Sequence, residues 1–543
     1  MPPKKLAPGY HGTSQYFMDT LRVIAFMEEA ELSPGAANPG MVMVDARPSM
    51  CGDEMRPPAM SVVEPTHDEA AFDKATTVQE VWSLCEQMLG YQVQPYAEQA
   101  RWPRPPQFQR LGSRLPFKLA KGPADVTASW ITDVMRYQGY LGMDESITSI
   151  KSQPIGAGEG EFSELAMVDI TGVESPRGAP KCPRSMIAKF SPPGMGSFPL
   201  AFTFGSEAHF YNDLSDEGAL LVRPQALFIG AQFSRLYKVL GAFSKALYCF
   251  VISNANPPDA PSLCFKRVDG CSSIPHLMLA VQGLARMHAR WWGSSQKTKE
   301  LTWSISPKHL GGVMPTLPST FVTTGWVLEL KLGFKALPHL YSSNSAAVKF
   351  GEEYREFVEA VRPAIRRRRL AVVRELFRQP LTLIHGDTHL ENIFFGKQFQ
   401  GGAMFIDFGL TQLGHPLSDI SELLGTGMIP KVRRAHEEAI VRHYHRCLLE
   451  YGVKDFSWEQ CWKDYKFQFM RVLIKILHVA PSFVRERKNR EGMFSQMPNK
   501  GDQKLLAMYK EMNTRLAAAL NDHNWVENIK DLPITAGTFR PFQ

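Results

Sequence analysis

Three polar side chains between residues 383 and 410 have the types and the spacing that phosphoryl transfer with a divalent cation requires. In the segment HGDTHLEN, Asp387 precedes Asn392 by five positions, and Asp407 follows in the segment FIDFGL. Transfer of a γ-phosphoryl group needs metal ions that neutralise charge and a group that orients the attacking hydroxyl. We therefore expect Asp387 to orient the acceptor hydroxyl and accept its proton, and Asn392 and Asp407 to bind the metal.

This prediction depends on the two segments together, because neither is specific alone. A short H-G-D or D-F-G sequence is more often a turn whose Asp hydrogen-bonds to nearby backbone. Here apolar runs at 381–384, 393–395 and 403–406 bracket the polar residues and predict short buried strands. These strands would hold the three polar side chains on a rigid support.

A glycine-rich segment upstream is suited to holding phosphate groups. Gly156, Gly158 and Gly160 lie between two strand-like runs. Because glycine lacks a Cβ, a hairpin that contains it can approach phosphate closely and adopt positive φ. A glycine-rich turn by itself is more often only a turn, so the prediction that these residues bind ATP depends on the next part of the chain.

A lysine in an apolar strand lies in that next part. The run from Met186 to Phe190 predicts a strand, and it contains Lys189. A buried ammonium is costly without an acidic partner, and Glu207 is the best candidate because it lies in a helix-like segment that starts with Gly-Ser. We expect Glu207 to position Lys189, and Lys189 to engage the α- and β-phosphates of ATP. The alternative is an ordinary surface ion pair.

Several segments together resemble the catalytic region of the aminoglycoside phosphotransferase and choline-kinase-like superfamily, in particular its ecdysteroid-kinase-like branch. They include HGDTHLENIFF, FIDFGL, GHPLSDISELL, PADVTASWITDVMRYQGYL, PIGAGEGEFSELAMVDI, MIAKF and GLARMHARWW. The resemblance covers about residues 116–524. It implies an α+β, protein-kinase-like bilobal fold, with a small β-rich N-lobe and a mainly helical C-lobe, and ATP-dependent phosphorylation of a small molecule.

Two positions depart from the pattern of this family. Its members usually have an acidic residue and a Leu at the hinge after the fifth strand, where we assign the segment from Phe265 to Asp269, with Lys266 and Arg267. Basic residues at the hinge would change the local potential, so adenine recognition stays open.

The second departure is Gly409, which completes a D-F-G sequence that is common in protein kinases. A protein kinase, however, normally has Lys two positions after the catalytic Asp, and this chain has His389 there. The segment after Asp407 also contains no A-P-E sequence. A small molecule is therefore favoured over a protein as the acceptor.

The sequence divides into four parts. Residues 1–115 form an N-terminal extension of unknown role, rich in Pro and Gly, with one predicted helix from Val78 to Leu89. Residues 116–275 alternate between helix and strands as a nucleotide-binding N-lobe would, and residues 276–525 form a catalytic and substrate-binding C-lobe. Residues 526–543 are a tail without evident chemistry.

Composition limits the class of protein. With 543 residues, of which 44% are hydrophobic, the chain can bury a large core. A net charge of +7 is modest for this length and does not argue for nucleic acid, and no apolar run is long enough to span a membrane. The eight Cys contain no C-x-x-C, which favours a reducing compartment over a disulfide between Cys264 and Cys271. We expect a cytoplasmic protein; organelle targeting is the weaker alternative.

Three classes of function compete. The leading one is an ATP- and Mg2+-dependent phosphotransferase that acts on a hydroxyl group of a small molecule. A protein kinase is suggested by the D-F-G sequence, and a catalytically silent nucleotide-binding protein by the hinge and the extension. The intact Asp387, Asn392 and Asp407 favour an enzyme. The acceptor cannot be read, because acceptor pockets are built from variable helices and loops.

Overall fold

The computed structural model describes most of the regions that the motifs single out. The described residues are 71–96, 111–155, 164–176, 183–191, 198–214, 221–233, 246–293, 363–365, 367–368, 371–372, 375–376, 378–484 and 503–534. All of them belong to one compact unit, and residues 1–62 lie outside the described residues.

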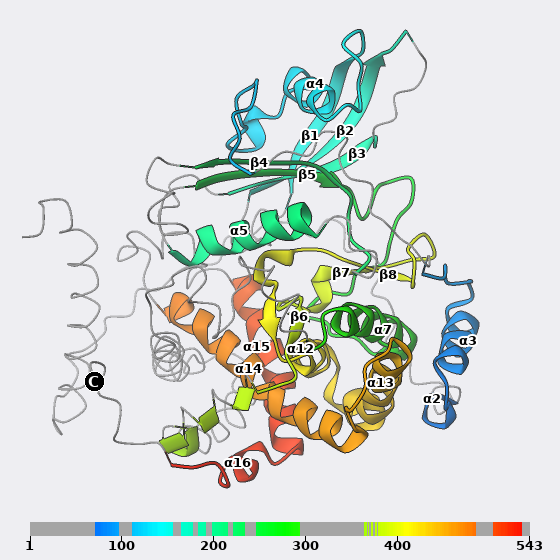
Figure 1. The fold of residues 1–543 in the computed structure, drawn as a ribbon, viewed down its shortest axis with the longest axis vertical. Helices are drawn as coiled ribbons and strands as arrows, with labels where there is room; N and C mark the ends of the chain where they lie inside the picture. Colours follow the sequence, from blue (N-terminus) through cyan, green and yellow to red (C-terminus); the bar gives the residue numbers. More distant parts are fainter. Residues whose placement is uncertain are drawn as a thin grey trace, which may run out of the picture. The chain divides into compact units, whose positions relative to one another are not determined.

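A five-stranded antiparallel sheet forms the N-terminal half of the described fold (Figure 1). Its strands lie in the order β1-β2-β3-β5-β4, and each pair of neighbours is antiparallel. The strands are β1 (Ser146–Ile155), β2 (Glu164–Glu174), β3 (Ser185–Phe190), β4 (Ala226–Phe233) and β5 (Ala246–Ser253). The strand predicted from Met186 to Phe190 is confirmed as β3.

Two helices cover opposite faces of this sheet (Figure 1). The helix α4 (Ala128–Tyr137), which comes after the short 3-10 turn η1 (Pro123–Asp125), packs with the side chains of Ala188 and Phe190. The helix α5 (Phe198–Asp213) packs against β4 and β5 on the other side. Side chains alternate along a strand, so Lys189 lies on the α5 face, between two residues that face α4. The helix α5 begins well before the Gly-Ser pair predicted to start it.

The C-terminal half is mainly helical. Helix α7 packs against α13, and α12 packs against α14 and α15. The helices are α7 (Ile274–Arg290), α12 (Leu417–Gly427), α13 (Pro430–Glu450), α14 (Trp458–Val484), α15 (Gln503–Asp522) and α16 (Trp525–Asn528). Together with the sheet, this arrangement is the α+β, protein-kinase-like bilobal fold expected from the sequence.

Short strands lie among these helices and carry the catalytic segments. They pair as β6 (Thr382–Ile384) with β9 (Gln412–Gly414), and as β7 (Ile393–Phe395) with β8 (Ala403–Phe405). The 3-10 turns η3 (Leu390–Asn392) and η4 (Phe408–Leu410) come directly after motif residues. The three predicted buried strands are therefore confirmed to within a residue or two at their ends.

Part of the N-terminal extension packs against the helical half. The predicted helix is confirmed as α3 (Val78–Leu89), preceded by α2 (Ala71–Lys74). Thr77 and Glu80 form a reciprocal capping box, which starts the helix by satisfying two free backbone N–H groups. Helix α3 packs against α7 and α13 and buries Val81 and Cys85.

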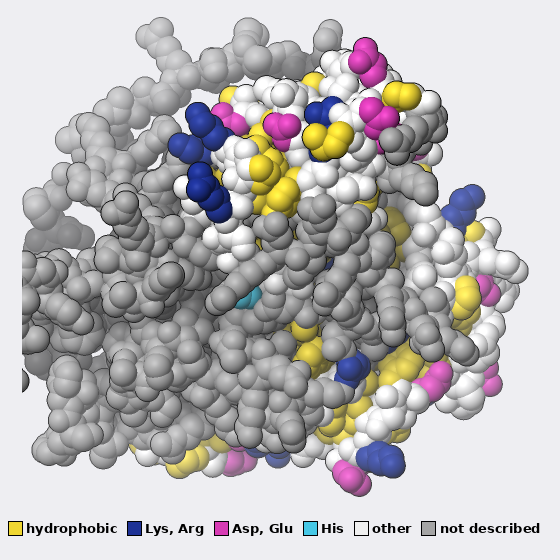
Figure 2. All heavy atoms as spheres, turned by 45° about the horizontal axis from the view of Figure 1, so that its top comes forward, with side chains coloured by type: hydrophobic (Ala, Val, Ile, Leu, Met, Phe, Trp, Pro, Cys, Tyr) yellow, Lys and Arg dark blue, Asp and Glu magenta, His cyan; other side chains and the backbone are white. Residues whose placement is uncertain are grey.

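Two general expectations can be compared with the described residues. The six Cys that the structure describes are all free, so the alternative of a disulfide between Cys264 and Cys271 is wrong. Within the described ranges, no helix is long and apolar enough to cross a membrane. On the described part of the face in Figure 2, several Lys and Arg side chains lie together at the upper left, with Asp, Glu and apolar side chains to their right.

Candidate active site

The loop between β6 and η3 is held by the carboxylate of Asp419, in the first turn of α12. Asp419 accepts hydrogen bonds from the backbone N–H groups of His385 (2.7 Å) and Gly386 (2.9 Å), one on each oxygen. The hydroxyl of Thr388 donates to the backbone carbonyl of Asp419 (2.7 Å), and His288 contacts its carboxylate (3.2 Å). Because buried polar groups are costly without partners, these bonds fix the path of the loop.

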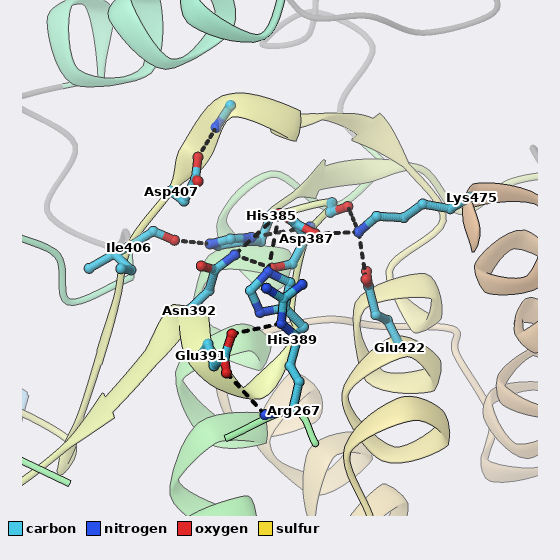
Figure 3. A network of polar contacts seen from close by, with 12 residues as sticks. Arg267, His385, Asp387, His389, Glu391, Asn392, Ile406, Asp407, Glu422 and Lys475 are labelled. Atoms are coloured by element: carbon cyan, nitrogen blue, oxygen red, sulfur yellow. Dashed lines mark hydrogen bonds and ion pairs between the residues drawn. The ribbon is translucent and has the colours of Figure 1, made fainter. Parts of the chain in front are cut away.

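Gly386 is required by the turn at this point of the loop. Its φ is 80°, in the left-handed region that favours glycine. A Cβ at this position would overlap the backbone carbonyl of Leu410. The loop therefore passes close to η4, and a second contact joins the same two segments, because His385 Nε2 donates to the carbonyl of Ile406 (3.0 Å; Figure 3).

Asp387 points into a group of polar side chains from three elements (Figure 3). Its Oδ1 accepts a bond from Lys475 of α14 (2.5 Å), and its Oδ2 accepts one from the amide nitrogen of Asn392 (3.2 Å). His389 Nε2 lies 3.6 Å from Oδ2. Burial opposes ionisation of Asp387, but the neighbouring groups, of which the Lys475 ammonium contributes most, together outweigh it and hold the pKa of Asp387 well below its ordinary value.

Lys189 bridges two carboxylates from different halves of the fold. Its Nζ lies 2.7 Å from Glu207 Oε2 on α5 and 3.0 Å from Asp407 Oδ1, which comes after β8. The expected pairing of Lys189 with Glu207 is thus present, and it is buried. Burial alone would lower the pKa of Lys189, but the carboxylates of Asp407 and Glu207 keep it above its ordinary value. Burial raises the pKa of Glu207 to about 7.

Asp407 has a backbone conformation that aims its side chain. Its φ is 60°, and its Oδ1 also accepts from Gly409 N (3.4 Å) as the cap of η4. Left-handed φ is uncommon for residues other than glycine and often occurs at functional sites. The next residue, Phe408, stacks on Phe210 of α5 with ring centroids 3.9 Å apart. This stacking and the Lys189 bridge together fasten the Asp407 segment to α5.

The two predicted metal ligands present oxygens that a cation could use. Asn392 donates from its amide nitrogen to both the backbone and the side chain of Asp387, so its amide oxygen is the atom left to face a metal. The side chain of Asp407 is 42% exposed. Among the described residues, no group of three or more His, Cys, Asp and Glu side chains could hold a metal.

The assignment of the hinge is wrong. Strand β5 ends at Ser253, so the residues directly after the fifth strand are Asn254, Ala255 and Asn256. The segment that begins at Phe265 comes later in the chain, after Leu263 has paired with β7. The resemblance to the family suggested the hinge, but the end of the fifth strand is set by its pairing with β3 and β4, which the sequence does not display.

Arg267 has a different role from the one that the hinge assignment implied. Its guanidinium Nε lies 2.8 Å from Glu391 in η3 (Figure 3). It therefore ties the segment before α7 to the turn that ends in Asn392.

The predicted site residues are not all described. Gly156, Gly158 and Gly160 lie outside the described residues, although Ile155 of β1 pairs with Leu165 of β2, so they fall in the connection between two paired strands. The structure brings together the other five, which are Lys189, Glu207, Asp387, Asn392 and Asp407.

Two residues at the site were missed by sequence reasoning. Lys475 and Glu422 both lie in helices, where a single Lys or Glu is normally a solvated side chain. Lys475 is 88 residues from Asp387 in the sequence and belongs to no motif. The one signal was that Glu422 lies in the same GHPLSDISELL segment as Asp419.

Comparison with known proteins gives one family match. Residues 264–455 match the ecdysteroid kinase-like family. No curated protein matches the chain.

Similar solved structures include three small-molecule kinases. An ethanolamine kinase of Plasmodium vivax is 12% identical, with 73% of this chain and 90% of that chain covered and a TM-score of 0.37. A choline kinase from Cryptosporidium parvum is 10% identical, with 75% of this chain and 98% of that chain covered and a TM-score of 0.40. The aminoglycoside 2'-phosphotransferase-IIIa in its GDP complex is 12% identical, with 70% of this chain and 97% of that chain covered and a TM-score of 0.35. The family match supports the resemblance for the motifs that lie within residues 264–455, which are similar to the ecdysteroid kinase-like family.

Proposed function

We propose that this chain is an ATP- and Mg2+-dependent phosphotransferase that acts on a hydroxyl group of a small molecule. The observation that carries the proposal is the bridge from Glu207 through Lys189 to Asp407. It joins a strand of the sheet to the segment that the His385 contact ties to the loop of Asp387. Phosphate-binding and hydroxyl-orienting groups are thereby adjacent, as phosphoryl transfer requires.

On the nucleotide side, Lys189 would contact phosphate oxygens and Glu207 would hold its ammonium in place. A Lys whose carboxylate partners keep its pKa high stays charged at neutral pH, as phosphate binding needs. Asp407 and the amide oxygen of Asn392 would hold Mg2+, which neutralises charge on the phosphates when it is bound.

On the acceptor side, Asp387 would orient the hydroxyl. Each of its oxygens accepts one bond from the protein, Oδ1 from Lys475 and Oδ2 from Asn392, and each carboxylate oxygen has a second lone pair for a substrate O–H. A carboxylate with a low pKa is a weak base. In a loose transition state the hydroxyl loses its proton late, so orientation is the larger contribution, and Asp387 receives the proton at the end.

The acceptor class is inferred from the family match and from the short segment after Asp407. The residues from η4 to β9 and α12 succeed one another without a long insertion. The match to a family named for kinases of a small hydroxylated molecule supports the same kind of acceptor here.

The test is a screen of hydroxylated metabolites with Mg-ATP, read by mass spectrometry as a mass increase of one phosphate. Asp407→Ala protein serves as the control for contaminating kinases. Phosphorylation of a metabolite by the parent and not by the control supports the proposal. Transfer to added proteins alone would favour a protein kinase, and binding of Mg-ATP without transfer to either would favour a silent nucleotide-binding protein.

A further inference from the structure

Lys475 makes three hydrogen bonds at the site, and they use all the donors that it has. Its ammonium donates to Asp387 Oδ1 (2.5 Å), to Glu422 Oε1 (2.5 Å) and to the backbone carbonyl of Gly386 (3.0 Å; Figure 3). An ammonium has three N–H groups. Lys475 is therefore saturated, and its three acceptors come from the H-G-D loop and from α12.

These bonds restrict the position of the Asp387 carboxylate. The bond to the Gly386 carbonyl holds the ammonium beside the backbone of the same loop, so Oδ1 has a fixed partner on one side. Asn392 holds Oδ2 on the other. A carboxylate that is hydrogen-bonded at both oxygens has little freedom to rotate. This matters because a small displacement of the orienting group lowers the rate of phosphoryl transfer.

Glu422 gives Lys475 a partner besides Asp387. The Glu422 side chain is 7% exposed and lies in α12, one turn after Asp419, which anchors the backbone of the loop. One short helix thus holds both the loop and the lysine that reaches the loop. An ammonium with only one carboxylate partner would follow that carboxylate when it moved, whereas the second carboxylate, Glu422, fixes Lys475 to the helix.

The charged and titratable groups around this cluster come from several elements. Besides Asp387 itself, those facing it in the described part of the chain are Lys475, Arg471, Glu422, Asp419, His385 and His389.

We propose that Lys475, held by Glu422, is a positioning residue that sets the orientation of Asp387 toward the acceptor hydroxyl. The proposal rests on the proposed function, because orientation matters only if a hydroxyl is phosphorylated at Asp387. It concerns a residue beyond the segment that matches the known family, which ends at residue 455. His389 occupies the position where a protein kinase has Lys, and here an ammonium reaches the Asp from α14 instead.

The first test compares Lys475→Met with the parent in transfer from Mg-ATP to the alcohol that the metabolite screen returns. We expect kcat to fall by about 10- to 10²-fold, the range that a small misplacement of a reacting group causes, with the Mg-ATP dissociation constant unchanged in calorimetry. Lys475→Arg should recover part of kcat because it keeps a cation, and Glu422→Gln should lower kcat less than Lys475→Met does. Lys463→Met, an exposed change on the same helix, should match the parent.

Two results in this test would overturn the proposal. One is an unchanged kcat in Lys475→Met. The other is a loss of Mg-ATP affinity that parallels the loss of kcat, because a general disturbance of the site would lower both. If Lys475→Met does not fold, the charge-balanced variant Lys475→Met/Glu422→Gln replaces it in the same comparison.

The second test does not depend on activity. A double-mutant cycle combines Lys475→Met with Asp387→Asn and measures the free energy of unfolding in urea. We expect the double variant to lose less stability than the two single losses added together, because either change alone removes the shared contact. Additive losses would overturn the positioning role. A parent that phosphorylates no alcohol would instead contradict the proposed function, and the cycle would still decide whether Lys475 holds Asp387.

Discussion

The proposed nucleotide side and the proposed acceptor side of the site each contain a lysine between two carboxylates. Lys189 lies 2.7 and 3.0 Å from its two partners, and Lys475 lies 2.5 Å from both of its own. The partners are Glu207 and Asp407 for the first, and Glu422 and Asp387 for the second. In each trio the glutamate is more buried than the aspartate, and burial raises the pKa of each glutamate to about 7.

The two trios differ in which member reaches solvent. On the nucleotide side the carboxylate of Asp407 is 42% exposed and the Lys189 side chain only 10%. On the acceptor side the order is reversed, with Lys475 at 29% and Asp387 at 19%. The difference indicates separate tasks. Asp407 is open to a cation, whereas Asp387 is screened and restrained, as a group that must keep one orientation should be.

The largest expected effect is on Asp387, and it separates the two sides. Asp387→Asn keeps the shape of the side chain but removes the charge, so we expect the transfer rate to fall by about 10²- to 10⁴-fold, the range for loss of a general base. The loss should lie toward the lower end if orientation outweighs proton transfer. Steady-state kinetics on the alcohol from the screen, paired with calorimetry of Mg-ATP, measure both properties. Asp259→Asn, an exposed loop variant, is the matched control.

If the acceptor side is distinct, Mg-ATP affinity should barely change in Asp387→Asn. An Asp387→Asn protein that turns over like the parent would remove Asp387 from the chemistry. A large loss of nucleotide affinity would show that the two sides are not separable.

The next effect concerns the exposed carboxylate of the nucleotide side. Asp407→Ala should weaken Mg-ATP binding by about 10- to 10²-fold, since hydrogen bonds and contacts to charged groups contribute about 1.5–3 kcal/mol each. The dependence of ATP affinity on Mg2+ should shrink with it, and calorimetry with and without chelator measures this.

The control for Asp407 must also test backbone strain. Asp455 is exposed and has φ 58°, close to the 60° of Asp407, so Asp455→Ala makes the same backbone change away from the site. It should leave Mg-ATP affinity unchanged. Equal ATP binding in Asp407→Ala, with chelator present or absent, would show that the metal assignment is wrong.

A smaller effect on Mg-ATP binding is expected from a change at Lys189. Lys189→Met should weaken Mg-ATP binding by about tenfold, because a charge-assisted contact to phosphate is lost while the fold stays intact. Lys151→Met, an exposed change on β1 of the same sheet, controls for loss of a positive charge. Circular dichroism checks the fold of both variants. Undiminished turnover in Lys189→Met would exclude Lys189 from the site.

The sequence predicts all three members of the first trio but only Asp387 of the second. Lys189 lies in a short apolar strand, where a charged residue needs an explanation, and Glu207 comes after it at a family spacing. The three motif strands were predictable for a similar reason, because short apolar runs between polar turns have few alternatives. In these cases the local pattern contains the constraint.

Lys475 could not be predicted, because its constraint is tertiary. It lies on a long helix, and only the packing of α14 against α12 brings its ammonium to Asp387. The hinge failed for a related reason. The end of β5 at Ser253 is set by pairing with β3 and β4, and the loop after it has no apolar pattern to mark where a hinge begins.

The smallest expected effect is on the free energy of unfolding. It tests whether ionisation of the buried Glu422 destabilises the folded protein. Burial raises the pKa of Glu422 from an ordinary 4.5 to about 7, so the folded protein binds more protons than the unfolded chain between these values. The stability that this group contributes is fully present below about pH 4.5 and is lost as the pH rises through about 7.

The variant Glu422→Gln cannot ionise at this position. Its free energy of unfolding, relative to the parent, should therefore rise between pH 5 and pH 8, by on the order of 1–3 kcal/mol, since one pKa unit corresponds to about 1.4 kcal/mol. Urea unfolding at the two pH values measures the difference, with Glu511→Gln on the exposed face of α15 as the control. Glu207 is present in both proteins, so its own titration cancels. If the free energy of unfolding of Glu422→Gln relative to the parent stays constant or falls with pH, Lys475 neutralises Glu422 fully. Ionisation of Glu422 would then not destabilise the folded protein.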